Sequence, residues 1–154
     1  MALEYTLHFK TQESAKVQIE NILEVLEWHY KQEVVSEKCI LFSFVNSPGF
    51  TIYFMESFNR HLTINDSEYD FDSSMTFRIS KESSPSIYKK NLIKFALSFI
   101  KRSNYFSVLL FNGEQVILVN DDKGLVVNNN GFWFGDLIDE LEGFTYIQKS
   151  FDLL

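Results

Sequence analysis

The chain has 154 residues, with 21 Asp and Glu against 14 Lys and Arg, so its formal net charge is −7. Hydrophobic residues make up 45% and aromatic residues 16%, a composition typical of a globular chain and unlike that of a disordered one. The single cysteine excludes an internal disulfide and a thiolate metal cluster. The length predicts one domain over residues 1–154, large enough to bury its own core.

The N-terminal residues alternate between apolar and polar and do not resemble a signal peptide. The most apolar stretch, residues 92–100, is interrupted by Lys94 and Ser98 and is shorter than the roughly 20 residues that cross a bilayer. We therefore expect a cytoplasmic protein without a membrane partner.

Strict alternation over residues 3–10 predicts a half-buried strand. Thr11 is expected to cap a helix that continues to about Lys31, because apolar residues recur at helical spacing. They are Ile19, Ile22, Leu23, Leu26 and Tyr30. Residues 39–46 and 50–54 are rich in β-formers and predict a hairpin about Ser47-Pro48-Gly49.

Two short strands are expected near residues 61–72 and 75–80. Ser84 before Pro85 predicts the start of a second helix that ends near Arg102. Further strands are expected at residues 105–111, 115–120 and 125–127, with Asn112-Gly113 as a hairpin turn. Trp133, Leu137 and Leu141 predict a short last helix, which Gly143 would end.

Hairpins outnumber crossovers in this order of elements. The sequence therefore predicts an α+β fold: a single two-layer domain with a mostly antiparallel sheet, on which two long helices and a short C-terminal helix pack.

The sequence contains no nucleophile elbow, no phosphate-binding loop and no His-Glu-x-x-His motif. Cys39 begins an apolar strand, as a buried small hydrophobe does, which disfavours a nucleophile. His8 lies on the polar face of the first strand and is expected to be solvated, while Arg60 disfavours a second positive charge on His61. We therefore expect no enzymatic activity, no cofactor and no metal.

The sharpest local feature is a run of carboxylates at every second position: Asp66, Glu68, Asp70 and Asp72. In an extended strand they would share one face, roughly 7 Å apart in succession. Phe71 stands where a calcium loop requires glycine, which argues against a calcium site. Two interpretations remain open. The charges guard a strand edge against pairing, or they form a docking surface for a basic partner, with Tyr69 as an anchor if a bulge turns it outward.

A second acidic cluster lies on the predicted last helix: Asp136, Asp139, Glu140 and Glu142. It is read either as a solvated helix face or, through Asp136, Asp139 and Glu140, as the second choice of docking surface. Basic residues gather on the second helix, at Lys90, Lys94 and Lys101, but the net charge of −7 repels a polyanion. No nucleic-acid partner is expected.

Several segments of the chain match a known family in the same order and at similar spacing. They are Ala2-Leu3-Glu4-Tyr5, Phe111-Asn112-Gly113-Glu114 with the returning Val116-Ile117-Leu118, and Trp133 leading to Leu137 and Leu141. Through them the chain resembles the Sit-type immunity proteins of bacterial polymorphic toxin systems. The resemblance implies a cytoplasmic, non-enzymatic protein that binds one cognate toxin tightly, and it carries over no site residue.

We expect an immunity protein that binds and neutralises a cognate toxin through an acidic surface. Its charge would steer association with a basic toxin such as a nuclease. The alternative is a small-molecule-binding or accessory regulatory domain, in which some of the 16 Phe line a pocket rather than fill a core. The sequence leaves the oligomeric state open.

Overall fold

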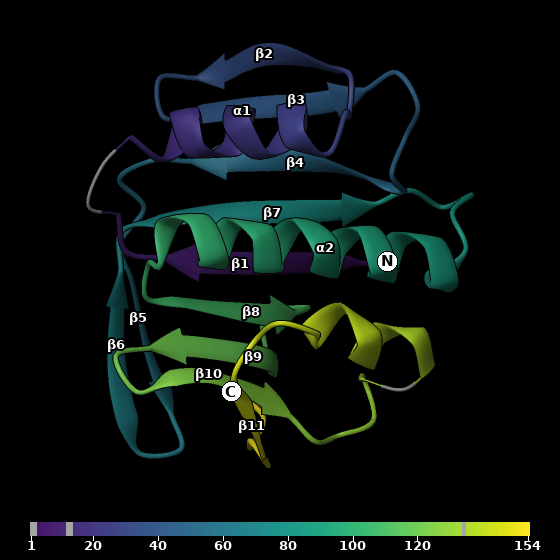
Figure 1. The fold of residues 1–154 in the computed structure, drawn as a ribbon. Coiled ribbons are helices and arrows are strands. Elements are labelled where there is room, and N and C mark those ends of the chain that lie inside the picture. The colour runs from purple at the N-terminus through teal and green to yellow at the C-terminus, as the bar shows by residue number, and fades with distance from the viewer. Residues whose placement is uncertain (1–2, 12–13, 134) are drawn as a thin grey trace.

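A computed structural model describes residues 3–11, 14–133 and 135–154 (Figure 1). The elements in chain order are β1 (Glu4–Phe9), α1 (Ala15–Val25), β2 (Tyr30–Ser36), β3 (Cys39–Phe44), β4 (Phe50–Met55), β5 (Arg60–Ile64), β6 (Ser67–Phe71), β7 (Ser73–Ile79), α2 (Pro85–Ser103), β8 (Ser107–Phe111), β9 (Gln115–Asp121), β10 (Gly124–Asn128), the 3-10 helix η1 (Gly135–Leu141) and β11 (Tyr146–Lys149). Ala2, which begins the first resembling segment, lies outside the described residues.

Among the described residues, nine strands form one sheet in the order β11-β10-β9-β8-β1-β7-β4-β3-β2. Neighbouring strands are antiparallel except for β10 and β11, which are parallel. The helices α1, α2 and η1 lie on one face of this sheet (Figure 1). The predicted α+β class, with a mostly antiparallel sheet, is confirmed.

The main core lies between the sheet and the helices. Tyr5, Leu7 and Phe9 of β1 point into it, as their alternation predicts. The apolar stripe of α2 meets them: the rings of Phe9 and Phe99 pack with centroids 4.9 Å apart. Phe77 lies between Phe50, at 5.3 Å, and Phe95, at 5.6 Å. The aromatic side chains therefore pack against one another and fill this layer.

Strands β5 and β6 form a hairpin on the opposite face of the sheet, where one strand near residues 61–72 was expected. Asn65 and Asp66 connect them with φ of 47° and 68°, the two-residue turn with left-handed residues that suits the strand twist. The inner face of the hairpin buries Leu62, Ile64 and Phe71 against β8 and β9. The structure thus adds a partial third layer to the predicted arrangement.

The prediction that the first helix runs from Thr11 to Lys31 is wrong at both ends. Ser14, and not Thr11, is the residue before α1. The helix ends at Val25, and the chain reverses where Glu27 takes φ 59° and the Trp28 N–H donates to the Leu23 carbonyl. Tyr30 and Lys31 belong to the edge strand β2 instead.

The C-terminal region contains the expected short helix and one strand that was not expected. The helix η1 is a 3-10 helix that buries Leu141 in the main core, and Gly143 follows it with φ 86°. Trp133 is buried ahead of it, and its Nε1–H donates to the Ile117 carbonyl at 3.3 Å. Strand β11 then extends the sheet beside β10.

Candidate partner-binding surface

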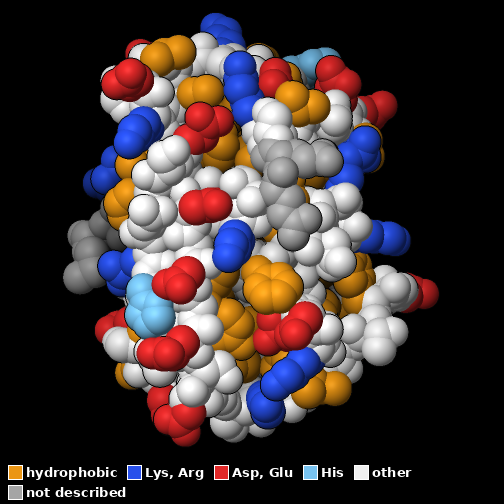
Figure 2. Space-filling model, turned by 90° about the vertical axis from the view of Figure 1, so that its left-hand side faces the viewer, with side chains coloured by type: hydrophobic (Ala, Val, Ile, Leu, Met, Phe, Trp, Pro, Cys, Tyr) orange, Lys and Arg blue, Asp and Glu red, His pale blue; other side chains and the backbone are white. Residues whose placement is uncertain are grey.

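The structure places the predicted site residues on two surfaces. Residues Asp66, Glu68, Tyr69, Asp70 and Asp72 belong to the β5–β6 hairpin or directly follow it, whereas Asp136, Asp139 and Glu140 belong to η1. The hairpin packs on one face of the sheet and η1 on the other, so the two sets do not form one site. Figure 2 shows the side with the hairpin, where red acidic side chains surround a pale blue histidine.

His61 of β5 lies between the two outward-facing carboxylates of β6. Its Nδ1 is 2.6 Å from Oδ1 of Asp70, and its Nε2 is 3.5 Å from Oε1 of Glu68. The hydrogen bond with Asp70 raises the pKa of His61, contrary to the expectation from Arg60. The stability that the His61–Asp70 pair contributes is therefore fully present below the ordinary pKa of histidine, and it is lost as the pH rises through the raised pKa of His61. When protonated, His61 also reduces the repulsion between the carboxylates of Glu68 and Asp70. A contact within the fold therefore explains in part why these carboxylates lie together.

Tyr69 faces inward, and the register of the hairpin contains no bulge that would turn it outward. Its ring stacks on Phe71 with centroids 6.1 Å apart, and its hydroxyl donates to Oδ2 of Asp121 at 2.9 Å. Burial, followed by this hydrogen bond, raises the pKa of Tyr69 to about 12. The main-chain N–H of Lys123 donates to the other oxygen of Asp121. Tyr69 therefore ties the hairpin to the β9–β10 turn.

Asp72 has a structural role. Its Oδ1 accepts hydrogen bonds from the N–H of Thr11 at 3.0 Å and from the Thr11 hydroxyl at 3.1 Å. The half-buried carboxylate thus fixes the segment that leads from β1 toward α1. The acidic face of the hairpin is consequently shorter than the sequence predicts, because its fourth carboxylate is already engaged.

We predict that Asp72→Ala lowers the free energy of unfolding by about 1–2 kcal/mol, since two partly buried donors on Thr11 lose their acceptor. Urea denaturation would measure this change. Asp72→Asn keeps one acceptor oxygen and should lose less, and Glu68→Ala, a change on the exposed face, should leave stability nearly unaltered. Equal losses in the alanine and asparagine variants would contradict the hydrogen-bonding role.

A hollow of about 360 Å³ lies beside the hairpin, and β6 forms one of its walls. Tyr69 and Phe106 line it with aromatic surface, and Asp70 and Asp122 line it with carboxylates. Lys10 and Lys123 also line it, so its charge is mixed. Phe106 is 41% exposed. Sequence reasoning missed His61, Phe106, Asp121 and Asp122 as members of this surface. The acidic pair Asp121-Asp122 after a strand was the available signal, but it was interpreted only as a turn.

His8 lies beneath the hairpin and is buried, so the expectation of a solvated imidazole is wrong. Its ring centroid is 6.2 Å from that of Phe71, and its Nδ1 has no hydrogen-bond partner among the described residues. Burial, and secondarily the charge of Arg60, lowers the pKa of His8 to about 4. The hairpin therefore covers a histidine that the fold keeps neutral.

This burial predicts a sensitivity to acid. Between pH 6.5 and about 4 the unfolded chain binds a proton that folded His8 does not, so stability falls as the pH falls through this window. The loss attributable to His8 is about 3 kcal/mol at its lower end. Between pH 7 and 4.5, the free energy of unfolding of His8→Leu, measured by urea denaturation, should fall less steeply than that of the wild type. His29→Leu, which alters an exposed histidine, serves as the control, and an equally steep decline in His8→Leu would refute the assignment.

The carboxylates of η1 form the second acidic surface. Asp136 and Asp139 are exposed and Glu140 is half-exposed. Two lysines of the adjoining helix α2 lie over aromatic rings that flank η1 in the sequence: Nζ of Lys89 is 5.5 Å from the centre of the Phe132 ring, and Nζ of Lys101 is 5.7 Å from that of Phe144. Lys10 and Lys123 line the hollow beside the hairpin, so cationic groups lie near both acidic surfaces and do not by themselves favour either one for a basic partner.

The observations bear on the other functional hypotheses as well. Packed aromatic rings occupy the region where a ligand pocket between sheet and helices was considered. Cys39 is buried, and burial raises the pKa of its thiol, which disfavours the thiolate that catalysis would need. Within residues 3–11, 14–133 and 135–154, no three His, Cys, Asp or Glu side chains gather as metal ligands do. No helix in this described part is long and apolar enough to span a bilayer.

The fold and surface define an α+β protein with an acidic hairpin on the sheet face opposite its helices. The chain belongs to the SitI3-like family, whose model matches residues 3–137. This match confirms the resemblance to the Sit-type immunity proteins. No curated protein and no solved structure match the chain.

Proposed function

We propose that the protein is a cytoplasmic immunity protein that neutralises a cognate bacterial toxin by binding it, without chemistry of its own. The observation that carries this proposal is membership of the SitI3-like family over residues 3–137. A buried cysteine and a core filled with aromatic rings are consistent with an inhibitor that acts through its surface. The continuous sheet further supports the proposal that residues 1–154 form a single domain, which one cooperative unfolding transition would test.

The surface proposed for the toxin is the outward face of the β5–β6 hairpin, with Glu68 and Asp70, together with Asp66 in its turn and the adjoining hollow. The side chains of Glu68 and Asp70 are 74% and 79% exposed, so a basic partner can reach them. Aromatic surface from Tyr69 and Phe106 lies next to these charges. This combination suits arginine-rich protein surfaces, including those of nucleases. The carboxylates of η1 remain the second choice.

Co-expression tests the function directly. The protein should restore growth to cells that produce the toxin domain encoded beside its gene, and the two should co-purify as a stable complex. A toxin from an unrelated system serves as the specificity control. Failure to protect against any neighbouring toxin, with a folded and soluble protein in the cell, would refute the proposal.

A further inference from the structure

A second surface lies at the opposite end of the sheet from β9 and β10, where α1 ends and the edge strand β2 begins. A groove of about 700 Å³ opens there between the end of α1, the start of β2 and Asn46 after β3. Its lining consists of Leu23, Glu24, Glu27, Trp28, His29, Tyr30 and Asn46. The groove exists because the chain reverses after Val25 instead of continuing as a helix.

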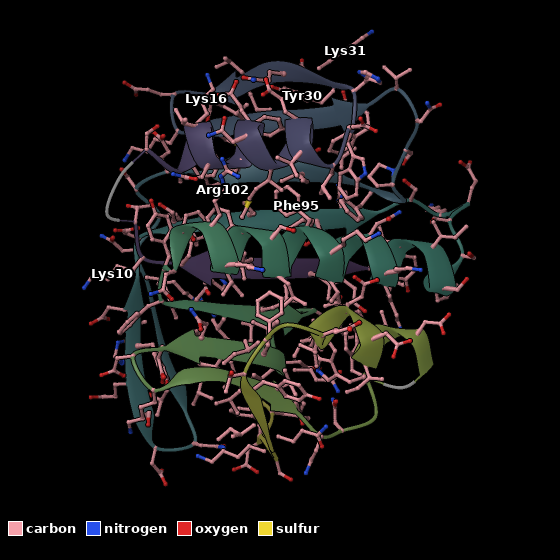
Figure 3. The ribbon with its side chains drawn as sticks, viewed as in Figure 1. Lys10, Lys16, Tyr30, Lys31, Phe95 and Arg102 are labelled. Atoms are coloured by element: carbon pink, nitrogen blue, oxygen red, sulfur yellow. The ribbon has the colours of Figure 1, made fainter. Side chains whose placement is uncertain are left out.

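The aromatic walls of the groove are held in place from behind. Trp28 packs on Phe95 in a stacked arrangement at 6.2 Å and on Phe50 edge-to-face at 6.0 Å. Tyr30 packs on Phe42 at 5.7 Å, and Figure 3 shows it on β2 beside α1. This packing fixes both rings before any partner arrives. Because the two rings are only half-buried, part of their surface is open to the groove.

The charge in the groove is negative and unpaired. Glu24 and Glu27 are exposed, and no lysine or arginine nitrogen in the described part of the chain lies within 4.0 Å of either carboxylate. Lys31, the nearest lysine in the sequence, points away from the body of the molecule (Figure 3). Burial and the negative charges of Glu20 and Glu24 raise the pKa of Tyr30, so its hydroxyl stays neutral beside these carboxylates.

We infer that this groove binds an arginine side chain of a protein partner. A guanidinium is planar and cationic, so it can stack on Trp28 or Tyr30 while it donates hydrogen bonds to the carboxylates of Glu24 and Glu27. A lysine ammonium lacks the planar fork, and an anionic or nucleic-acid ligand would be repelled. The assignment of the partner as the toxin rests on the proposed function, whereas recognition of arginine by the groove does not.

The experiment uses N-acetyl-arginine amide as the probe and follows the amide and indole N–H resonances of the whole protein. Saturable shifts are expected at residues 23–30 and at Asn46, with smaller shifts for the neutral isostere N-acetyl-citrulline amide. Glu24→Gln with Glu27→Gln should weaken the apparent affinity about fivefold or more. The matched control, Glu37→Gln with Glu114→Gln, changes the net charge equally at exposed sites elsewhere and should bind as the wild type does.

Glu27→Gly separates binding from folding. Glycine accepts φ 59° more readily than glutamate, so this variant should be at least as stable as the wild type and still bind the probe more weakly. Shifts that spread over all acidic surfaces without saturation, or that survive the Glu24 and Glu27 changes, would overturn the inference. Because this titration needs no toxin, its failure is distinguishable from a failure of the co-expression experiment.

Discussion

Gly49→Ala is expected to lower the free energy of unfolding by about 3–5 kcal/mol, the sum of backbone strain and overpacking. Gly49 has φ +108°, a conformation that side chains rarely permit. A Cβ at this position would lie 2.5 Å from the Ser83 Oγ and 2.6 Å from the Cβ of Tyr88. Tyr88 is buried on α2 and cannot move aside without disturbing the core. Urea or thermal denaturation measures the loss.

Gly124→Ala is the matched control for this prediction. Gly124 has nearly the same conformation, φ +113°, but a Cβ there would meet nothing within 4 Å. Its substitution should therefore cost only the backbone strain, about 1–2 kcal/mol. The difference between the two variants isolates the contact between the β3–β4 turn and α2. Equal losses would show that this contact is loose and that α2 is held by its apolar stripe alone.

The fold was predictable from sequence where hydrophobic periodicity and turn chemistry agree. Alternation identified β1, Asn112-Gly113 identified the β8–β9 hairpin, and Ser84-Pro85 identified the start of α2. Two of the errors, the end of the first helix and the missed β5–β6 turn, share one cause: non-glycine residues occupy left-handed positions. Glu27 stands where a helix usually ends on glycine, and Asn65-Asp66 forms a turn without the glycine that marks one.

Helical spacing then misled the assignment of the first helix, because Tyr30 continues the pattern of Ile19 and Leu26 and reaches the same core from a strand. Periodicity reports which side chains point toward the core and not which backbone carries them there. Strand β11 was missed for a related reason. Its four residues are mostly exposed and show no alternation that would distinguish them from a loop.

The site was predictable only within the hairpin. Once Asn65-Asp66 is recognised as its turn, the register opposes His61 to Asp70, and their hydrogen bond follows. The bond from Tyr69 to Asp121 joins residues 52 positions apart and depends on where the hairpin crosses the sheet. The burial of His8 depends on the same crossing. No local sequence pattern indicates such long-range contacts.

The largest expected effect on binding belongs to the hairpin surface. With the toxin that the protein neutralises in co-expression, Glu68→Lys with Asp70→Lys should lower the association rate constant about 10- to 100-fold at low ionic strength. The long-range attraction to a basic toxin weakens at the docking face, and the dependence of the rate on salt should weaken with it. Stopped-flow fluorescence at several salt concentrations measures both. Asp72 is left unchanged, because its carboxylate holds Thr11 and its loss would unsettle the fold.

The matched control for this prediction is Asp139→Lys with Glu140→Lys, which changes the net charge by the same amount on the opposite face of the sheet. If the hairpin is the docking surface, this variant should associate at close to the wild-type rate. Equal slowing in both variants would mean that the overall charge of −7 steers the encounter and that neither surface is special. Slowing in the η1 variant alone would show that the toxin docks on the helical face of the sheet. The hairpin carboxylates would then only pair with His61 and keep the chain soluble.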